Sequence, residues 1–223
     1  MTDSSATPPP QAPPQEDVPS RKLMVTLAGA GALAGLMIVF VYGWTQPTIR
    51  AYKARMLAAA VQEVLRIPAR YDTLYVHEGR LVDQLPDGAT AADLEVVYLG
   101  YDADGSRIGY AITAGEPGFQ DIIGLIFGYD NNEGRLLGMK VLESKETPGL
   151  GDKIEKDADF VGQFHGALTP LLGVKPRNAS DDLHEIDMIT GATISSRTII
   201  RTINNAVERL GPMLDAYDEG AGP

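Results

Sequence analysis

The segment from Asp187 to Ser196 holds the chain's strongest chemical signal. It reads Asp-Met-Ile-Thr-Gly-Ala-Thr-Ile-Ser-Ser, with hydroxyl residues on both sides of a Gly-Ala pair. Apolar residues then recur at helical spacing, which predicts a helix from about Thr193 to Leu210, ended by Gly211-Pro212. A helix start offers unpaired N–H groups and the positive end of the helix dipole, and both attract phosphate. The segment therefore indicates a phosphate site, although hydroxyl residues also cap helices without any ligand.

A second motif lies about forty residues upstream and reads Glu146-Thr147-Pro148-Gly149-Leu150-Gly151. By itself it is a Pro-Gly turn after a predicted strand, and many turns have this composition. Its place before the first motif, with strands ahead of it and a helix after the pair, is more specific than either motif alone.

Together the two motifs resemble the covalent FMN-binding domain family. The family's Asp-x-x-(Ser/Thr)-Gly-Ala-Thr motif is matched position by position by Asp187, Thr190, Gly191, Ala192 and Thr193. Within this family, the chain is most similar to the G subunits of Rnf-type ion-translocating electron transport complexes. The C subunits of the sodium-pumping NADH:quinone reductase are close relatives. The resemblance runs from the apolar N-terminal segment to Leu210 and leaves out the Pro-rich N-terminus.

The resemblance implies FMN as the cofactor, joined through its phosphate to Thr193 as a phosphoester by a flavin transferase. Thr190 stands where many members of the family have Ser, which keeps the hydroxyl. Gly191 leaves room for the phosphate or the transferase. Asp187, Thr190 and Ser196 are interpreted as residues that fix the loop, and Asp187 either helps the transferase to read the motif or is an ordinary cap.

The resemblance also implies that the upstream motif, from Glu146 to Gly151, packs against the isoalloxazine ring. Thr147 then offers a hydroxyl, Leu150 an apolar contact, and Gly149 and Gly151 exposed N–H groups. Such contacts tune a flavin while the ring itself performs the redox chemistry. Lys145 and Lys153 lie close enough in sequence to offset phosphate charge, but solvated surface positions suit them equally well.

The composition excludes several other functions. The formal net charge of -11 argues against nucleic-acid binding, which needs a basic face. The chain has no cysteine, which rules out disulfides, thiolate metal sites, iron–sulfur clusters and cysteine nucleophiles. His77, His165 and His184 lack paired ligand spacing, so no metal site is expected. Redox chemistry in this chain therefore needs an organic cofactor.

The N-terminal region predicts a membrane anchor. Residues 1–22 are rich in proline and polar residues, which predicts a disordered tail. Residues 23–44 carry no charge and as a helix span about 33 Å, enough for a bilayer core. No small-residue cleavage site follows, which favours an uncleaved transmembrane helix over a signal peptide. Gly29, Gly31 and Gly35 give it a small-residue face to which another membrane helix could pack.

The orientation of this anchor is not decided by its flanking charges. Arg21 and Lys22 precede the span, whereas Arg50, Lys53 and Arg55 follow it. The resemblance implies a bacterial inner-membrane protein that crosses the membrane once, with its N-terminus in the cytoplasm and the FMN domain on the periplasmic side.

The remaining pattern predicts an α+β fold with antiparallel strands. A linker helix is expected within residues 45–70, stopped by Pro68. Strands are expected over 73–77, 94–101, 107–113, 122–129 and 136–142, with Asp104-Gly105 as a hairpin turn. A short helix over 160–168 and the long final helix complete an FMN-binding domain over 71–212, followed by a flexible tail over 213–223.

The expected function is electron transfer. The chain is interpreted as a flavoprotein subunit that relays electrons, together with other membrane subunits, in a complex that couples electron transfer to ion translocation. It would act as part of a translocase and turn over no substrate of its own. Two alternatives remain at this stage: an FMN-bearing sensor or accessory domain of another respiratory system, and a flavin-free envelope scaffold in which Thr193 only caps a helix.

Overall fold

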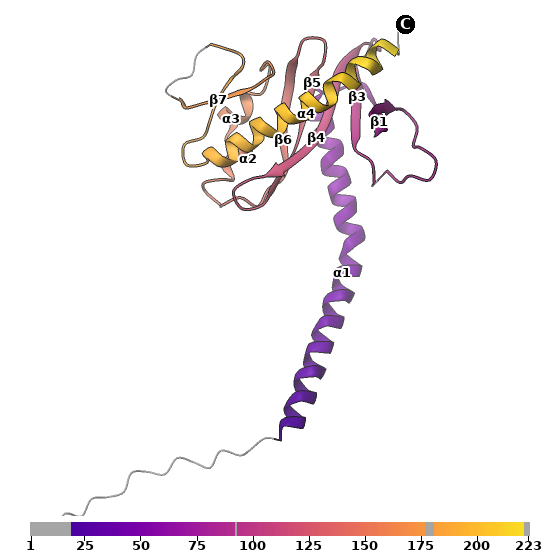
Figure 1. Cartoon of the computed structure of the whole chain (residues 1–223), viewed down its shortest axis with the longest axis vertical. Coiled ribbons are helices and arrows are strands. Elements are labelled where there is room, and N and C mark those ends of the chain that lie inside the picture. The colour runs from indigo at the N-terminus through magenta and orange to yellow at the C-terminus, as the bar shows by residue number, and fades with distance from the viewer. Residues whose placement is uncertain (1–18, 92, 177–180, 221–223) are drawn as a thin grey trace, which may run out of the picture. The chain divides into compact units, whose positions relative to one another are not determined.

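The computed structural model describes residues 19–91, 93–176 and 181–220 (Figure 1). Most of the predicted Pro-rich tail and the last three residues lie outside this range. The chain divides into two compact units, Met1–Tyr52 and Lys53–Pro223. The second unit holds both sequence motifs.

The first described element is a single helix, α1 (Ser20–Val64), where the sequence predicts two helical segments. Pro47 lies inside it, and the helix continues because long helical runs on both sides outweigh the lost hydrogen bond and the crowding that proline causes. The helix ends at Val64, before Pro68, because Arg66 and Ile67 take left-handed φ angles of 58° and 61°. Side chains over residues 21–44 are exposed, and α1 is the one described helix long and apolar enough to cross a membrane.

The centre of the second unit is a six-stranded antiparallel sheet in the order β2-β1-β3-β4-β5-β6. Its strands are β1 (Arg70–His77), β2 (Arg80–Val82), β3 (Val96–Tyr101), β4 (Arg107–Pro117), β5 (Ile122–Asp130) and β6 (Arg135–Glu143). All five strands expected from the sequence are present, and β2 is additional. The Asp104-Gly105 hairpin turn joins β3 to β4, with Gly105 at φ 83°.

The chain after β6 is built from short elements. These are α2 (Lys153–Lys156), α3 (Ala158–Gly162), β7 (Leu172–Val174) and β8 (Glu185–Asp187), with β7 and β8 paired in parallel. The short helix expected over 160–168 begins earlier and ends at Gly162. It begins at Ala158 because the Asp157 side chain caps it, accepting hydrogen bonds from the N–H groups of Asp159 and Phe160.

The final helix, α4 (Thr193–Gly220), starts where the sequence predicts and runs past the predicted end. Gly211 and Pro212 lie inside it, and the expected flexible tail over 213–223 is helical as far as Gly220. Tertiary contacts explain the difference, because Leu214 is fully buried and Tyr217 packs against the core. Their burial outweighs the helix-breaking tendency of the Gly-Pro pair.

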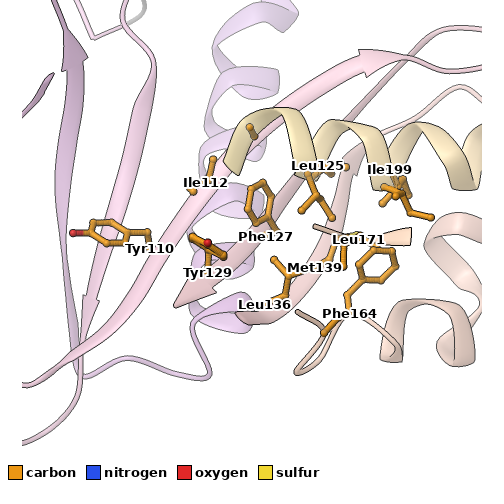
Figure 2. Close-up of a cluster of buried hydrophobic side chains, with 14 of the residues drawn as sticks. Tyr110, Ile112, Leu125, Phe127, Tyr129, Leu136, Met139, Phe164, Leu171 and Ile199 are labelled. Carbon is orange, nitrogen blue, oxygen red and sulfur yellow. The ribbon is translucent and has the colours of Figure 1, made fainter. Parts of the chain in front are cut away.

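Two apolar clusters hold the sheet between helices. Figure 2 shows the larger one, in which Ile199 of α4 lies with Leu125 and Phe127 of β5 on one face of the sheet. On the other face, Val61 and Val64 of α1 join a cluster with Ile126 of β5. Because alternate strand residues point to opposite faces, β5 supplies both clusters. This arrangement fixes the start of α4 relative to the ends of β4, β5 and β6.

Candidate functional site

The structure brings the two sequence motifs together around one cavity of about 370 Å³. The upstream motif forms the loop between β6 and α2, and the downstream motif forms the turn into α4. The loop between β4 and β5 contributes a third wall. The cavity is lined by Phe119, Glu146, Thr147, Leu150, Gly151, Gly191, Ala192, Thr193, Ile194 and Ser195.

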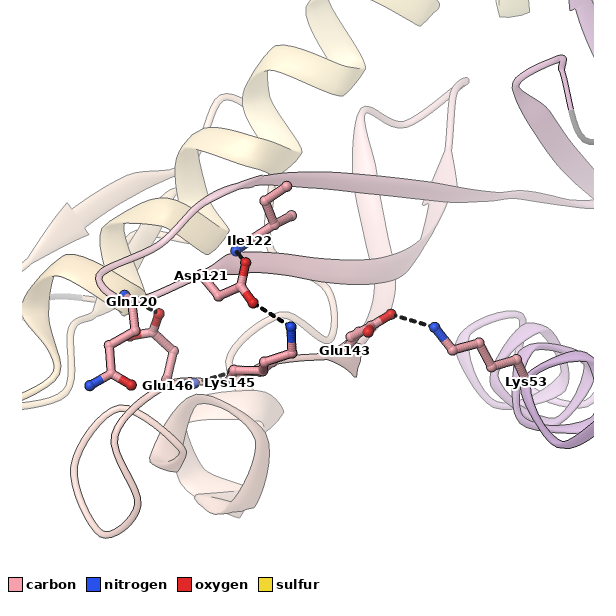
Figure 3. A network of polar contacts seen from close by, with 8 residues as sticks. Lys53, Gln120, Asp121, Ile122, Glu143, Lys145 and Glu146 are labelled. Atoms are coloured by element: carbon pink, nitrogen blue, oxygen red, sulfur yellow. Dashed lines mark hydrogen bonds and ion pairs between the residues drawn. The ribbon is translucent and has the colours of Figure 1, made fainter. Parts of the chain in front are cut away.

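The side chain of Glu146 joins these three walls by hydrogen bonds. It is 5% exposed, and its Oε1 accepts a hydrogen bond from the N–H group of Phe119 at 2.9 Å. The same oxygen accepts a hydrogen bond from the N–H group of Gln120 at 3.0 Å (Figure 3). Its Oε2 accepts a hydrogen bond from Ser195 Oγ at 2.6 Å. One carboxylate therefore ties the β4–β5 loop and the first turn of α4 to the upstream motif.

Two glycines make room for this carboxylate. A Cβ added at Gly118 would stand 2.6 Å from Glu146 Oε1, and one added at Gly151 would stand 2.7 Å from Glu146 Cβ. Both distances are too short for any real contact. Gly151 is therefore required by packing inside the protein, whatever else it contacts. Gly149 needs glycine for a different reason, because its φ is 79° and its surroundings are open.

The environment of Glu146 keeps it ionised at neutral pH. Burial raises the pKa of the carboxyl, but hydrogen bonds from Ser195 and from the N–H groups of Gln120, Phe119 and Asp121 outweigh burial and bring the pKa below its ordinary value. All of these partners are neutral donors. The cavity wall therefore contains a negative charge without a bound cation.

The hydroxyl groups of the downstream motif fall into two classes. Ser195 and Ser196 are buried and bonded within the protein, Ser195 to Glu146 and Ser196 to Ala192 O at 2.9 Å. Thr190 and Thr193 are exposed. The first backbone bond at the start of α4 runs from Ser196 N–H to Ala192 O, so the N–H groups of Thr193 to Ser195 precede it and have no intrahelical acceptor among the described residues. An accessible hydroxyl thus stands beside the positive end of the helix dipole.

The turn that presents Thr193 is fixed locally. Ser196 Oγ accepts a hydrogen bond from Ile189 N–H at 3.2 Å, and Ala192 N–H donates to Ile189 O at 3.0 Å. Gly191 occupies the turn with φ 88°, a conformation that side chains disfavour. The Ser196 side chain therefore holds the loop together, as interpreted from the sequence, and is too buried to contact a ligand.

Asp187 does not cap α4, which begins six residues later. It lies on β8, where its N–H donates to Gln163 Oε1 at 2.6 Å and its carbonyl accepts from Gln163 Nε2 at 3.3 Å. Its Oδ1 is buried and has no hydrogen-bond partner among the described residues. A buried acceptor without a donor is costly.

A second cavity, of about 440 Å³, lies on the other side of Thr193. Thr193 is the residue that both cavities share. The second is lined by Lys175, Pro176, Met188, Thr190 and Thr193, and Lys175 is the one basic side chain among the described residues that line either cavity.

The two lysines considered from the sequence line neither cavity. Lys145 is bound to Asp121 at 2.6 Å (Figure 3), and Lys153 lies in α2. Sequence reasoning missed Lys175 because only the parallel pairing of β7 with β8, with Val174 opposite Asp187, brings it near the motif. It also missed Phe119, whose one signal is an aromatic residue in a Gly-rich turn.

Comparison with known proteins identifies the family. Residues 118–208, which include both motifs and Phe119, match the model of the FMN-binding domain family. The G subunit of an ion-translocating oxidoreductase complex from Vibrio vulnificus is 31% identical over 191 residues, which cover 84% of this chain and 88% of the relative. The chain belongs to the family of these G subunits. The corresponding G subunit from Methanosarcina acetivorans is 29% identical, with 84% of this chain and 92% of the relative covered.

Solved structures show the same fold. The crystal structure of Shewanella oneidensis NqrC has a TM-score of 0.65 at 16% identity and covers 74% of this chain and 99% of that one. The C subunit of the Na(+)-translocating NADH-quinone reductase from Parabacteroides distasonis has a TM-score of 0.53 at 21% identity, with 64% and 77% covered. The α+β fold and the family expected from the sequence are therefore confirmed.

FMN is the cofactor of this family, and the two cavities suit its two parts. Phe119, Leu150 and Ile194 are 64%, 51% and 50% exposed and form an apolar edge around the first cavity, as a flat aromatic ring requires. The second cavity combines a hydroxyl with the Lys175 amine, as a phosphate requires. The residues present therefore fit FMN, and a flavin-free scaffold does not account for them.

Proposed function

We propose that the protein is a membrane-anchored flavoprotein subunit that carries FMN as a phosphoester on Thr193. In this role it relays electrons inside a complex that couples electron transfer to ion translocation. The observation that carries the proposal is the position of Thr193, an exposed hydroxyl residue in the wall of both cavities. A flavin joined there has a place for its ring on one side and for its phosphate on the other.

Each group around Thr193 has a separate task in this proposal. Bound FMN supplies the electron chemistry, since it accepts and releases electrons at its ring. Lys175 and the free N–H groups at the start of α4 offset the phosphate charge. Phe119, Leu150 and Ile194 hold the ring by apolar contact. Thr147, Gly149 and Gly151 stay close to the ring in the upstream loop, and Glu146 fixes that loop to α4.

Attachment of the cofactor requires a flavin transferase. The Thr193 Oγ–P bond forms while the P–O–P bridge of a flavin pyrophosphate donor breaks, the other half of the donor leaves as a phosphate monoester, and the hydroxyl proton passes to solvent. Thr190 and Gly191 leave Thr193 accessible to that enzyme, and Asp187, at the start of the motif, helps the enzyme to read it. A covalent tether keeps the flavin at an effective concentration on the order of millimolar, even where the ring is open to partners.

The anchor places this chemistry at a membrane. We propose that residues 23–44 of α1 cross a bacterial inner membrane once, that the N-terminus is cytoplasmic, and that the domain with Thr193 is periplasmic. Thr26 and Thr45 donate their hydroxyls to the carbonyls of Lys22 and Val41 in α1, which satisfies both hydroxyls within the helix. The partners are other membrane subunits of the complex, and no independent substrate turnover is expected.

Mass spectrometry of the full chain, produced together with a flavin transferase, tests the attachment. The expected adduct equals one FMN minus water and maps to Thr193. Thr193→Ala should abolish it, whereas Thr190→Ala should leave Thr193 loaded. An adduct on Thr190, or a flavin that denaturation releases from the wild-type chain, would contradict the proposal.

A further inference from the structure

Glu146 places a negative charge in the cavity that Thr193 shares. It is the one charged side chain among the described residues that line this cavity. Its partners are Ser195 Oγ and the N–H groups of Phe119 and Gln120, and no cation is paired with it among the described residues. Lys145, the residue before Glu146, is exposed and paired with Asp121, so its charge is offset.

We infer that Glu146 lowers the reduction potential of the flavin held at Thr193. The inference rests on the proposed function, because it needs a flavin in this cavity. Each electron delivered from a partner's redox centre adds one negative charge to the cavity unless a proton follows. The ionised carboxylate repels that charge, and the repulsion is strong because a buried charge is poorly screened by water.

The arrangement is more specific than structural bracing demands. A neutral side chain is enough to bind two N–H groups and one hydroxyl, and a buried unpaired charge is expensive. Yet the side chain at this position is a carboxylate, and the start of α4, where the helix dipole favours a negative group, supports its charge through Ser195. The protein thus stabilises a negative charge beside the site instead of avoiding it.

The Glu146→Gln variant removes the negative charge but keeps the hydrogen bonds, so it separates the effect of the charge from the structural role of the side chain. A glutamine Oε1 still accepts from Phe119 and Gln120, and its amide can donate to Ser195 Oγ once that hydroxyl rotates. The potential of the attached flavin is measured by spectroscopic redox titration of the full chain in detergent. We expect Glu146→Gln to raise the potential by at least a tenfold change in the one-electron equilibrium, about 59 mV.

Two further variants complete the test. Glu146→Asp keeps the charge, so its potential should lie closer to the wild type than to Glu146→Gln. Glu143→Gln removes an exposed carboxylate that is paired with Lys53 at 2.9 Å and lines neither cavity, so its shift should be less than a third as large. An unchanged potential in Glu146→Gln, or equal shifts in the Gln and Asp variants, would overturn the inference. A wild-type chain without attached flavin would instead overturn the proposed function.

A second measurement uses the wild-type chain and so holds even if Glu146→Gln fails to fold. Coupling between two sites is reciprocal, so a carboxylate that disfavours reduction must itself bind a proton more readily once the flavin is reduced. Infrared difference spectra over a pH series, with ¹³C-labelled glutamate, should show a buried carboxyl that becomes protonated at higher pH in the reduced protein. Protonation at the same pH in both redox states would contradict the inference.

Discussion

Ser195 Oγ donates a hydrogen bond to Glu146 Oε2 across 2.6 Å, although 49 residues separate them in the chain. This contact joins the two motifs that the sequence shows as separate, and both side chains are buried. It also explains why Ser195, two residues after Thr193, is not available for attachment. The hydroxyl proposed to carry the flavin, on Thr193, and the hydroxyl that braces the loop, on Ser195, are therefore two residues apart and have different tasks.

Ser195→Ala is expected to destabilise the domain by about 1.5–3 kcal/mol, because it removes a hydrogen bond to a charged, buried partner. Thermal unfolding of the full chain in detergent measures the loss. Thr193→Ala is the matched control, since Thr193 is exposed at the helix start and its loss costs only about 1 kcal/mol. Equal stability of the two variants would show that the Glu146 contact contributes little.

Low pH should reduce the contribution of the Glu146–Ser195 contact to the stability of the domain. The folded-state pKa of Glu146 lies below its unfolded value of about 4.3, so the unfolded chain binds more protons and stability rises with pH. The contribution is complete above about pH 4.3 and is lost as the pH falls through the lower, folded-state pKa. Asp121 and Glu143, held below their usual pKa by Lys145 and Lys53, act in the same direction.

The contribution of Glu146 to this pH dependence is measured by comparing the acid unfolding of the wild type with that of Glu146→Gln. Asp121 and Glu143 are common to both proteins, so their contributions cancel. The stability difference between the two should shrink as the pH falls below about 4.3. A difference that is constant from pH 6 to the acid limit would show that ionisation of Glu146 does not stabilise the fold.

Gly191→Ala should cost about 1–2 kcal/mol and reduce flavin loading. The reason is backbone conformation, because φ is 88° and a Cβ there would meet only Leu150 Cδ2 at an ordinary 3.6 Å. Fluorescence of the denatured band gives the loading. Gly211→Ala, in the interior of α4 with open space around it, is the control and should be neutral or stabilising.

Gly149 tests the expected place of the ring. Gly149→Val should alter the absorption spectrum or the potential of a flavin that remains attached, since Gly149 is exposed in the upstream loop and a Cβ there has nothing within 4 Å, while the φ of 79° means that the valine also strains the turn. Gly151→Val is not equivalent, because it collides with Glu146 and should destabilise the domain itself. An unchanged spectrum and potential in Gly149→Val would place the ring elsewhere.

The sequence predicts those parts of the structure that local signals define. Alternating apolar residues predict the strands, and the hydroxyl-rich turn predicts the start of α4 at Thr193. It does not predict features that depend on distant contacts. Lys175 reaches the site through the pairing of β7 with β8, and α4 continues through Pro212 because Leu214 is buried. Pro47 and Pro212 predict helix breaks, but both residues lie inside helices that continue on either side of them.

Because α4 extends to Gly220, and not only to Leu210, a reporter that tests the topology cannot be fused after Leu210. Tyr110 of β4 donates a hydrogen bond to Asp218, and Arg107 pairs with the same carboxylate, so a fusion inside α4 would remove contacts that the domain uses. Reporters should therefore follow residue 223. Alkaline phosphatase is expected to be active there and a fluorescent protein that folds only in the cytoplasm to be dark, if the domain is periplasmic. The same two reporters placed before residue 20 should give the opposite pattern. A bright fluorescent protein after residue 223 would put Thr193 on the cytoplasmic side and reverse the proposed path of electrons through this protein.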